Sequence, residues 1–265
     1  PWMCMYNRRR ILIVSEYPSI YHKSLHSVVN KSASWPAHFN SIRFCIGIDV
    51  QIRRGCSWFA TSRDGKYSGS GWIDYDFPQQ TANRLRDELL DAVDASLDRV
   101  AIGIDAPRQP LFELRSHYWD RKSLSWQPRK AHQRGFGRHC EVVIRAMNLG
   151  NPQWTPPVDQ APNWMQLGFA LFRGLAYFPF VYEAFPSATL RLLDDKPQVT
   201  CEFSFAHLRQ GRRDMLDAAL AAVTVREYIN GEGIAVGNAD GLGSIILPCP
   251  PGRPIPSELS MGVTK

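Results

Sequence analysis

Acidic residues near the ends of apolar segments are the positions of this 265-residue chain best suited to chemistry. Asp49 closes FCIGID, Asp105 closes RVAIGID, and Glu183 interrupts FVYEAFP. Asp214 and Asp217 lie three residues apart in RRDMLDAALAAV. A buried carboxylate is costly unless it is paired, hydrogen-bonded or bound to a cation. Several carboxylates brought together by a sheet and a helix could hold Mg²⁺ or Mn²⁺, because these cations prefer oxygen ligands.

The segments around the first two acids predict the strands that would position them. SIRFCIGIDV and RVAIGIDAP are short apolar runs rich in β-formers, which is typical of buried strands. If the strands are central and parallel, Asp49 and Asp105 lie side by side at their carboxyl ends, where open α/β sheets bind ligands. Alternatively, each Asp caps a turn, a role that suits Asp105 before Ala-Pro.

The remaining acids also have a structural and a functional interpretation. Asp214 and Asp217 share one helix face with small and apolar residues, so both are expected to point toward the sheet. The alternative is that they begin a helix, where Asp favours the positive end of the helix dipole. Strand alternation places Glu183 on one face of its strand, where it could bind a metal or pair with an arginine.

Other patterns predict an α/β domain over residues 42–250, with residues 1–41 as an N-terminal extension and 251–265 as a tail. Residues 56–77 are expected to form a hairpin about Asp64-Gly65. Helices are predicted over 81–96, beginning near Thr81, and over 163–177 and 212–230. FPFVYEAFP and IILP are expected to be further strands, with polar connecting sequence from the first of these to about residue 203 and loop from Pro248.

An insertion at about residues 108–160 is rich in basic and aromatic residues. Guanidinium and ammonium groups neutralise phosphates, and aromatic rings stack on unpaired bases. We therefore expect an arm that binds DNA or RNA beside the acids, although an exposed basic loop with aromatics packed on the core is the alternative. Its predicted substrate-binding residues include Arg115, Arg129, Lys130, Arg134 and Arg138.

Composition narrows the function classes without choosing one. The net charge of +6 fits a polyanionic partner but does not require one. The six cysteines form no CxxC pair, so neither a zinc site nor a disulfide framework is indicated. The most apolar stretch, FALFRGLAYFPFVYEAF, is interrupted by Arg173, Pro179 and Glu183, so no membrane association is expected. A cytoplasmic protein is the simplest interpretation.

Taken in order, GID, GIDAP, YEAFP, RRDMLDAALAAV, a Gly-rich turn and IILP resemble the predicted-nuclease family catalogued as domain of unknown function 429. The resemblance runs from about residue 44 to 248. It implies an RNase H-like mixed β-sheet with an antiparallel hairpin edge and helices on both faces. It also implies a metal site of Asp49, Asp105, Glu183 and Asp217 with Asp214 nearby, and basic positions at Arg138 and Lys196. The Asp pair is likewise similar to that of Holliday-junction resolvases.

The resemblance departs from some RNase H-like enzymes in one respect, because only Glu88 could stand for an acid on the first helix. The expected activity is metal-dependent hydrolysis of phosphodiester bonds, with these carboxylates as ligands. Two alternatives stay open. One is a non-enzymatic nucleic-acid-binding module. The other is a nucleotide-binding phosphotransfer protein or ATPase, which is disfavoured because the sequence has no Walker loop.

Overall fold

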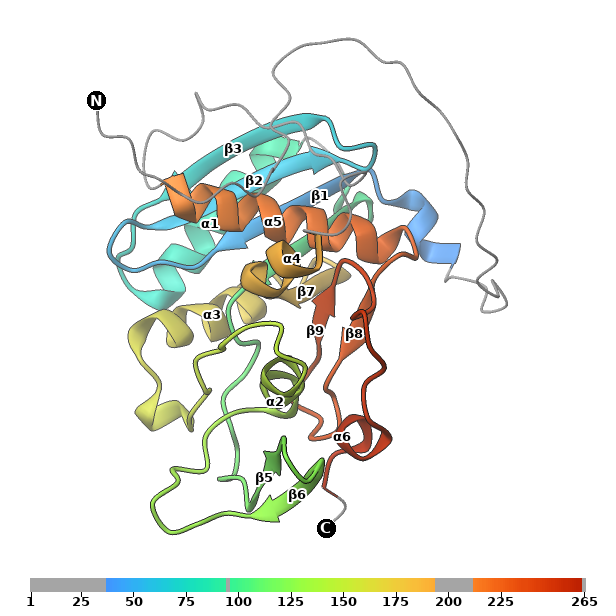
Figure 1. Cartoon of the computed structure of the whole chain (residues 1–265). Coiled ribbons are helices and arrows are strands. Elements are labelled where there is room, and N and C mark those ends of the chain that lie inside the picture. The colour runs from blue at the N-terminus through green and yellow to red at the C-terminus, as the bar shows by residue number, and fades with distance from the viewer. Residues whose placement is uncertain (1–36, 94–95, 194–211, 264–265) are drawn as a thin grey trace, which may run out of the picture.

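A seven-stranded mixed sheet of order β3-β2-β1-β4-β7-β9-β8 lies at the centre of the computed structural model, which describes residues 37–93, 96–193 and 212–263 (Figure 1). β1, β4, β7 and β9 run parallel, whereas β2, β3 and β8 are antiparallel to their neighbours. The strands are β1 (Phe44–Asp49), β2 (Cys56–Ser62), β3 (Tyr67–Ile73), β4 (Val100–Asp105), β7 (Phe180–Ala184), β8 (Ile234–Val236) and β9 (Ile245–Leu247).

Helices cover both faces of this sheet. α5 lies along one face with α4 beside it, and α1 and α3 pack together on the other (Figure 1). The bounds are α1 (Pro78–Val93), α3 (Asn163–Gly174), α4 (Pro186–Leu193) and α5 (Arg212–Ile229). The short 3₁₀ helices are η1 (Ala37–Ser41), η2 (Leu97–Arg99) and η3 (Val158–Gln160).

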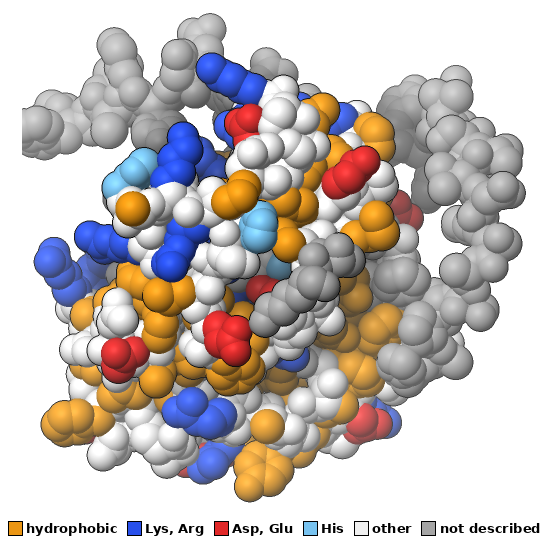
Figure 2. All heavy atoms as spheres, turned by 90° about the horizontal axis from the view of Figure 1, so that it is seen from below, with side chains coloured by type: hydrophobic (Ala, Val, Ile, Leu, Met, Phe, Trp, Pro, Cys, Tyr) orange, Lys and Arg blue, Asp and Glu red, His pale blue; other side chains and the backbone are white. Residues whose placement is uncertain are grey.

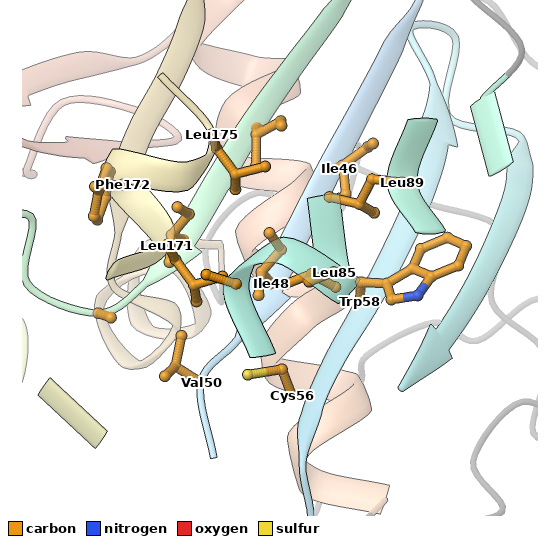
Figure 3. Packing of buried hydrophobic residues seen from close by; sticks show 14 of the residues in the cluster. Ile46, Ile48, Val50, Cys56, Trp58, Leu85, Leu89, Leu171, Phe172 and Leu175 are labelled. Atoms are coloured by element: carbon orange, nitrogen blue, oxygen red, sulfur yellow. The ribbon is translucent and has the colours of Figure 1, made fainter. Parts of the chain in front are cut away.

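The alternation of β1 and β4 decides which residues form the core and which form a site. Ile46 and Ile48 of β1 and their β4 partners Ile102 and Ile104 point toward α1 and α3, where they pack with Leu85, Leu89 and Leu171 (Figure 3). Successive side chains of a strand point to opposite faces. The residues between these isoleucines, together with the terminal Asp, therefore face α5.

Two glycines allow α5 to lie directly on this face of the sheet. A Cβ atom on Gly47 would come within 1.9 Å of the Ala218 carbonyl oxygen, and one on Gly103 within 2.6 Å of the Val225 side chain. Ala218 and Val225 are fully buried in this contact. Close packing of α5 therefore depends on the Gly-x-Asp pattern of both strands, which brings the helix to the two strand-end acids.

A second, smaller core lies at the far end of the molecule from α1. It joins the two-stranded hairpin of β5 (His117–Asp120) and β6 (Ser125–Pro128) with α2 (His139–Ala146) and α6 (Ser257–Met261), which together we call the hairpin lobe (Figure 1). Buried residues of α2 pack against β8, β9 and Leu259, with Trp119, Trp126 and Trp154 at the margin. The basic insertion thus packs into a second core that it shares with β8, β9 and α6.

The main sequence predictions of fold class are confirmed at this level. The chain forms an α/β fold with a mixed sheet, an antiparallel β2–β3 hairpin edge, and the two GID strands parallel and adjacent. Gly231 has a positive φ and follows the end of α5, as its position in the sequence predicts.

Several boundaries differ from the prediction. α1 begins at Pro78 rather than near Thr81, whose hydroxyl instead accepts a hydrogen bond from the Asp76 backbone N–H. α4 lies in a stretch expected to be polar connection, and α6 in the expected tail.

The end of the predicted extension contributes Phe39 to the core, where its ring lies edge-on to Phe180. Residues 1–36, and Lys196 in the segment 194–211, lie outside the described residues.

Candidate functional site

Asp49 and Asp105 are directly paired across the parallel β1–β4 ladder. Both end their strands at the carboxyl edge of the sheet, where open α/β folds bind ligands. Asp49 is buried, whereas Asp105 is partly exposed. The structure therefore brings these two predicted site residues together.

α5 supplies two more carboxylates above this pair. Asp214 is buried in the first turn of the helix, and its Oδ1 accepts a 2.7 Å hydrogen bond from Nη2 of Arg54. The Asp217 side chain is a quarter exposed, and its Oδ2 lies 3.8 Å from Nε of Arg213. Asp214 thus has a close cationic partner, while Asp217 retains only a distant and exposed one.

Electrostatics show that three of these acids are strongly affected by burial and by one another. Burial raises the pKa of Asp49 to about 8, and the charges of Asp217 and Asp214 add to the rise. Burial, followed by the charge of Asp49, raises the pKa of Asp105 well above its usual range. Burial also raises the pKa of Asp217 to about 6, against the opposing charge of Arg213. Like charges in a partly desolvated site resist simultaneous ionisation.

One oxygen of the cluster has no hydrogen-bond partner among the described residues. Asp49 Oδ2 is buried, and it makes no hydrogen bond to any described residue. Buried polar oxygens are usually hydrogen-bonded, and an orphan is a common sign of an ion or a water site. Nevertheless, no three His, Cys, Asp or Glu side chains within residues 37–93, 96–193 and 212–263 already converge as a metal-binding group.

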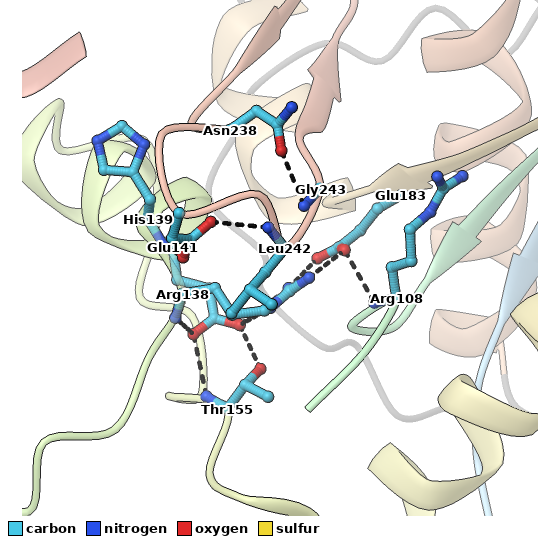
Figure 4. Close-up of polar contacts among 10 residues, drawn as sticks. Arg108, Arg138, His139, Glu141, Thr155, Glu183, Asn238, Leu242 and Gly243 are labelled. Atoms are coloured by element: carbon cyan, nitrogen blue, oxygen red, sulfur yellow. Dashed lines mark hydrogen bonds and ion pairs between the residues drawn. The ribbon is translucent and has the colours of Figure 1, made fainter. Parts of the chain in front are cut away.

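Glu183 belongs to a different environment. It is paired with Ile104 across the β4–β7 ladder, so it points to the face of the sheet opposite that of Asp105. Arg138 Nη1 donates a 2.7 Å hydrogen bond to Glu183 Oε2, and Nη2 of the same guanidinium contacts Oε1 (Figure 4). The Arg108 backbone N–H donates to Oε2 at 3.0 Å. Glu183 is therefore paired with an arginine, which is the alternative to metal binding that the sequence leaves open for it.

Arg138 links Glu183 to the start of α2. Its Nε and Nη2 donate to Glu141 Oε1 at 3.1 and 3.0 Å, and its side chain is fully buried. Glu141 also accepts hydrogen bonds from the Thr155 backbone N–H and hydroxyl (Figure 4). Burial opposes the charge of Arg138, but Glu183 and Glu141 raise its pKa well above the usual value. The network joins the sheet to the hairpin lobe through one guanidinium.

The two acidic environments meet at the edge of the sheet. A cavity of about 40 Å³ is lined by Asp105, Glu141 and Glu183 together with Trp164 and Phe185. Glu183 is thus near Asp105, and its charge contributes to the rise in the Asp105 pKa, yet it is engaged by Arg138. Of the four residues that the resemblance implies as metal ligands, the structure gathers three on one face and leaves the fourth on the other.

The predicted substrate-binding residues are also divided by the fold. Arg129, Lys130 and Arg134 are exposed in the hairpin lobe, as an interaction surface requires. In the face turned toward the viewer in Figure 2, Lys and Arg side chains gather on one side of the molecule. Arg115 and Arg138 are instead held against aromatic rings and carboxylates, respectively.

Two neighbours of the Asp49 site are not apparent from the sequence alone. Arg54 and Gln51 lie in the loop between β1 and β2, and both offset part of the rise in the Asp49 pKa. The pair Arg53-Arg54, in the loop that follows the GID strand, is the signal that could have drawn attention to this loop. Glu88, the weak sequence candidate, accepts a 2.6 Å hydrogen bond from Trp58 Nε1 on the α1 side of the sheet, the face opposite that of Asp49.

Comparison of the chain with protein-family models, with curated proteins and with solved structures gave no match in any of the three. Among the described residues, no helix has both the length and the apolar character needed to span a membrane.

Proposed function

We propose that the protein is a metal-dependent nuclease with an RNase H-like domain. The observation that carries the proposal is the in-register pair Asp49 and Asp105 beneath Asp217. One buried Asp49 oxygen has no hydrogen-bond partner among the described residues, and the pKa values of all three carboxyl groups are raised, first by burial and then by neighbouring acids. A divalent cation would relieve this repulsion and satisfy the orphan oxygen. The sheet order, with an antiparallel hairpin beside parallel β1, β4 and β7, supports the fold assignment.

The donor set fits a hard divalent cation in chemical type. Asp49, Asp105 and Asp217 would hold it through carboxylate oxygens, and small side-chain movements would complete the site because no preformed group of three exists among the described residues. A bound Mg²⁺ or Mn²⁺ supplies an activated water and stabilises charge on the leaving oxygen. Glu183 is assigned to the Arg138 network, and its charge adds to the rise in the Asp105 pKa.

The chain's own cations fit the charge of a phosphodiester substrate. Arg54 is more than half exposed and reaches Asp214 from the loop that follows Asp49. A guanidinium there can bind a phosphate oxygen while it holds the helix in place. The exposed Arg129, Lys130 and Arg134 would extend the basic surface along the bound strand. A cytoplasmic location and a nucleic-acid partner belong to the same proposal.

The decisive experiment is a cleavage assay with purified full-length protein. Labelled single-stranded, double-stranded, hybrid and junction nucleic acids are incubated with Mg²⁺ or Mn²⁺, with EDTA, and with the Asp49→Asn variant. Asp98→Asn is a matched control, because Asp98 is exposed at the opposite end of β4. We expect cleavage of at least one substrate that is lost with EDTA and in Asp49→Asn and kept in Asp98→Asn. Full activity of Asp49→Asn would refute the proposal.

A non-catalytic nucleic-acid-binding module on the same scaffold is the second candidate. The observation in its favour is the engagement of Glu183 by Arg138, which leaves fewer acids for a metal. Nucleic-acid binding without metal-dependent cleavage of any substrate in the same assay would select this function.

A further inference from the structure

A small cavity in the hairpin lobe gathers three arginines and three aromatic residues far from the acidic cluster. It lies between β5 and the exposed side of α2, which contact each other in the lower part of Figure 1. Its volume is about 80 Å³, well above the space that a single water requires. The charged and aromatic side chains that line it are Arg115, Arg121, Arg145, Tyr118, Trp119 and Trp154.

Arg115 forms a fixed cationic wall of this cavity. Its guanidinium lies 4.7 Å from the centre of the Tyr118 ring and 5.4 Å from that of Trp154. Nε and Nη2 donate to the Phe136 carbonyl oxygen at 3.2 and 2.8 Å, whereas the buried Nη1 makes no hydrogen bond to a described residue. The guanidinium is thus held in place by rings and one carbonyl. The charges of Glu141 and Asp240 act on it, but no carboxylate of the described residues forms an ion pair with it.

Arg121 and Arg145 close the cavity from the solvent side. Arg121 follows β5, and Arg145 lies in the last turn of α2, and both are exposed. Across the described residues, neither these two arginines nor Arg115 forms an ion pair with an acid. The acids whose charges act on Arg115 have other partners: Glu141 binds Arg138 and Thr155, and Asp240 accepts the backbone N–H groups of His139 and Leu242. Asp120, the neighbour of Arg121, accepts the backbone N–H groups of Lys122 and Ser123.

Three guanidinium groups around a cavity that no carboxylate lines favour an anionic ligand there. We propose that the cavity binds a backbone phosphate of a nucleic acid, so that the hairpin lobe anchors the substrate at a distance from the acidic cluster. The choice of nucleic acid as ligand rests on the proposed function. Arginine suits this role because its planar fork of donors matches phosphate oxygens, and the flanking rings can contact the adjoining sugar or base.

The test uses the full chain in EDTA, which prevents metal-dependent cleavage. Binding of a fluorescein-labelled oligonucleotide is followed by anisotropy over a series of salt concentrations. Wild type is compared with the double variant Arg121→Gln/Arg145→Gln and with Arg43→Gln/Arg99→Gln. The control removes the same charge from exposed residues at the amino ends of β1 and β4. We expect the cavity variant to bind about tenfold more weakly, with a salt slope smaller by about one, and the control to match wild type.

Calorimetric titration with inorganic phosphate at low ionic strength separates the two proposals. Phosphate should bind to wild type and to the control but not to the cavity variant. If wild type binds oligonucleotides and the cavity variant binds both ligands equally well, the pocket is overturned while the proposed function stands. If wild type binds no oligonucleotide, the proposed function fails. Loss of phosphate binding in the cavity variant alone would then support a pocket for another phosphorylated ligand, and equal or absent phosphate binding would overturn it.

Discussion

The cluster of Asp49, Asp105 and Asp217 and the network of Arg138, Glu141 and Glu183 bury carboxylates in opposite ways. In the network, one fully buried guanidinium contacts two carboxylates, and backbone and hydroxyl donors satisfy most of the remaining oxygens. In the cluster, the acids repel one another and one buried oxygen has no described partner. Carboxylates that are paired with a cation have a structural role. Buried carboxylates without such a partner lower the stability of the fold, and they point to a ligand that would bind them.

The largest expected effect comes from breaking the network. Arg138→Gln should lower the free energy of unfolding by about 3–5 kcal/mol, because it leaves two buried carboxylates without a cation. Urea unfolding at neutral pH measures this change. Arg129→Gln is the control, since Arg129 is exposed in the same lobe, and a change within about 0.5 kcal/mol is expected there.

Arg138→Lys keeps the charge and removes the fork of donors. It should fall between wild type and Arg138→Gln, because an ammonium group cannot contact both carboxylates with the same geometry. If Arg138→Gln lost less than about 1 kcal/mol, the network would not be the structural element described above, and the contrast with the acidic cluster would fail.

Substitution in the acidic cluster is expected to change the free energy of unfolding in the opposite direction and to stabilise the protein. The folded-state pKa of Asp49 is raised to about 8 from an ordinary 3.8, so its stability contribution is present below pH 4 and lost as pH rises toward 8. In EDTA at pH 8, Asp49→Asn should therefore raise the free energy of unfolding by about 1–3 kcal/mol. Urea unfolding at pH 5 and pH 8 should show a shallower pH dependence for the variant than for wild type.

Mg²⁺ sharpens this comparison. At pH 8 the cation should restore stability to wild type and have little effect on Asp49→Asn, because ligand binding to the folded state stabilises it. The exposed Asp98→Asn variant should behave as wild type throughout. A variant at Asp49 that is less stable than wild type at pH 8 in EDTA would show that the carboxylate is structural after all.

The same contrast explains how far the sequence alone could predict the molecule. Asp49, Asp105 and the α5 acids are marked by local patterns, namely GID at two strand ends and an amphipathic helix with small residues. These patterns predict both the secondary-structure element and the face on which each acid lies, because the strand and helix periods fix the direction of the side chains. The predicted adjacency of the two strands is confirmed for that reason.

The Glu183 environment could not be chosen from such patterns. Its partner Arg138 lies 45 residues away in the sequence. It is the residue directly before the eight-residue helix α2, inside the basic insertion. A basic residue there is expected on the surface, and only tertiary packing makes it the largest fully buried side chain among the described residues. The hairpin lobe is equally nonlocal, because its core joins α2 with β9 and Leu259.

The smallest effect is expected at Asp214, which has a cationic partner like the acids of the network and lies beside Asp49 like the acids of the cluster. Its partner Arg54 is exposed, so Arg54→Gln should lower the free energy of unfolding by less than about 1 kcal/mol, and by less at high salt. Arg53→Gln is the matched control, since Arg53 is the exposed neighbour and forms no ion pair with a described acid. In nucleic-acid binding measured by anisotropy, Arg54→Gln should reduce the salt slope by about one if this arginine also contacts phosphate. Equal stability and equal slopes for the two variants would place Arg54 outside the site and leave Asp214 as the acid of a helix first turn.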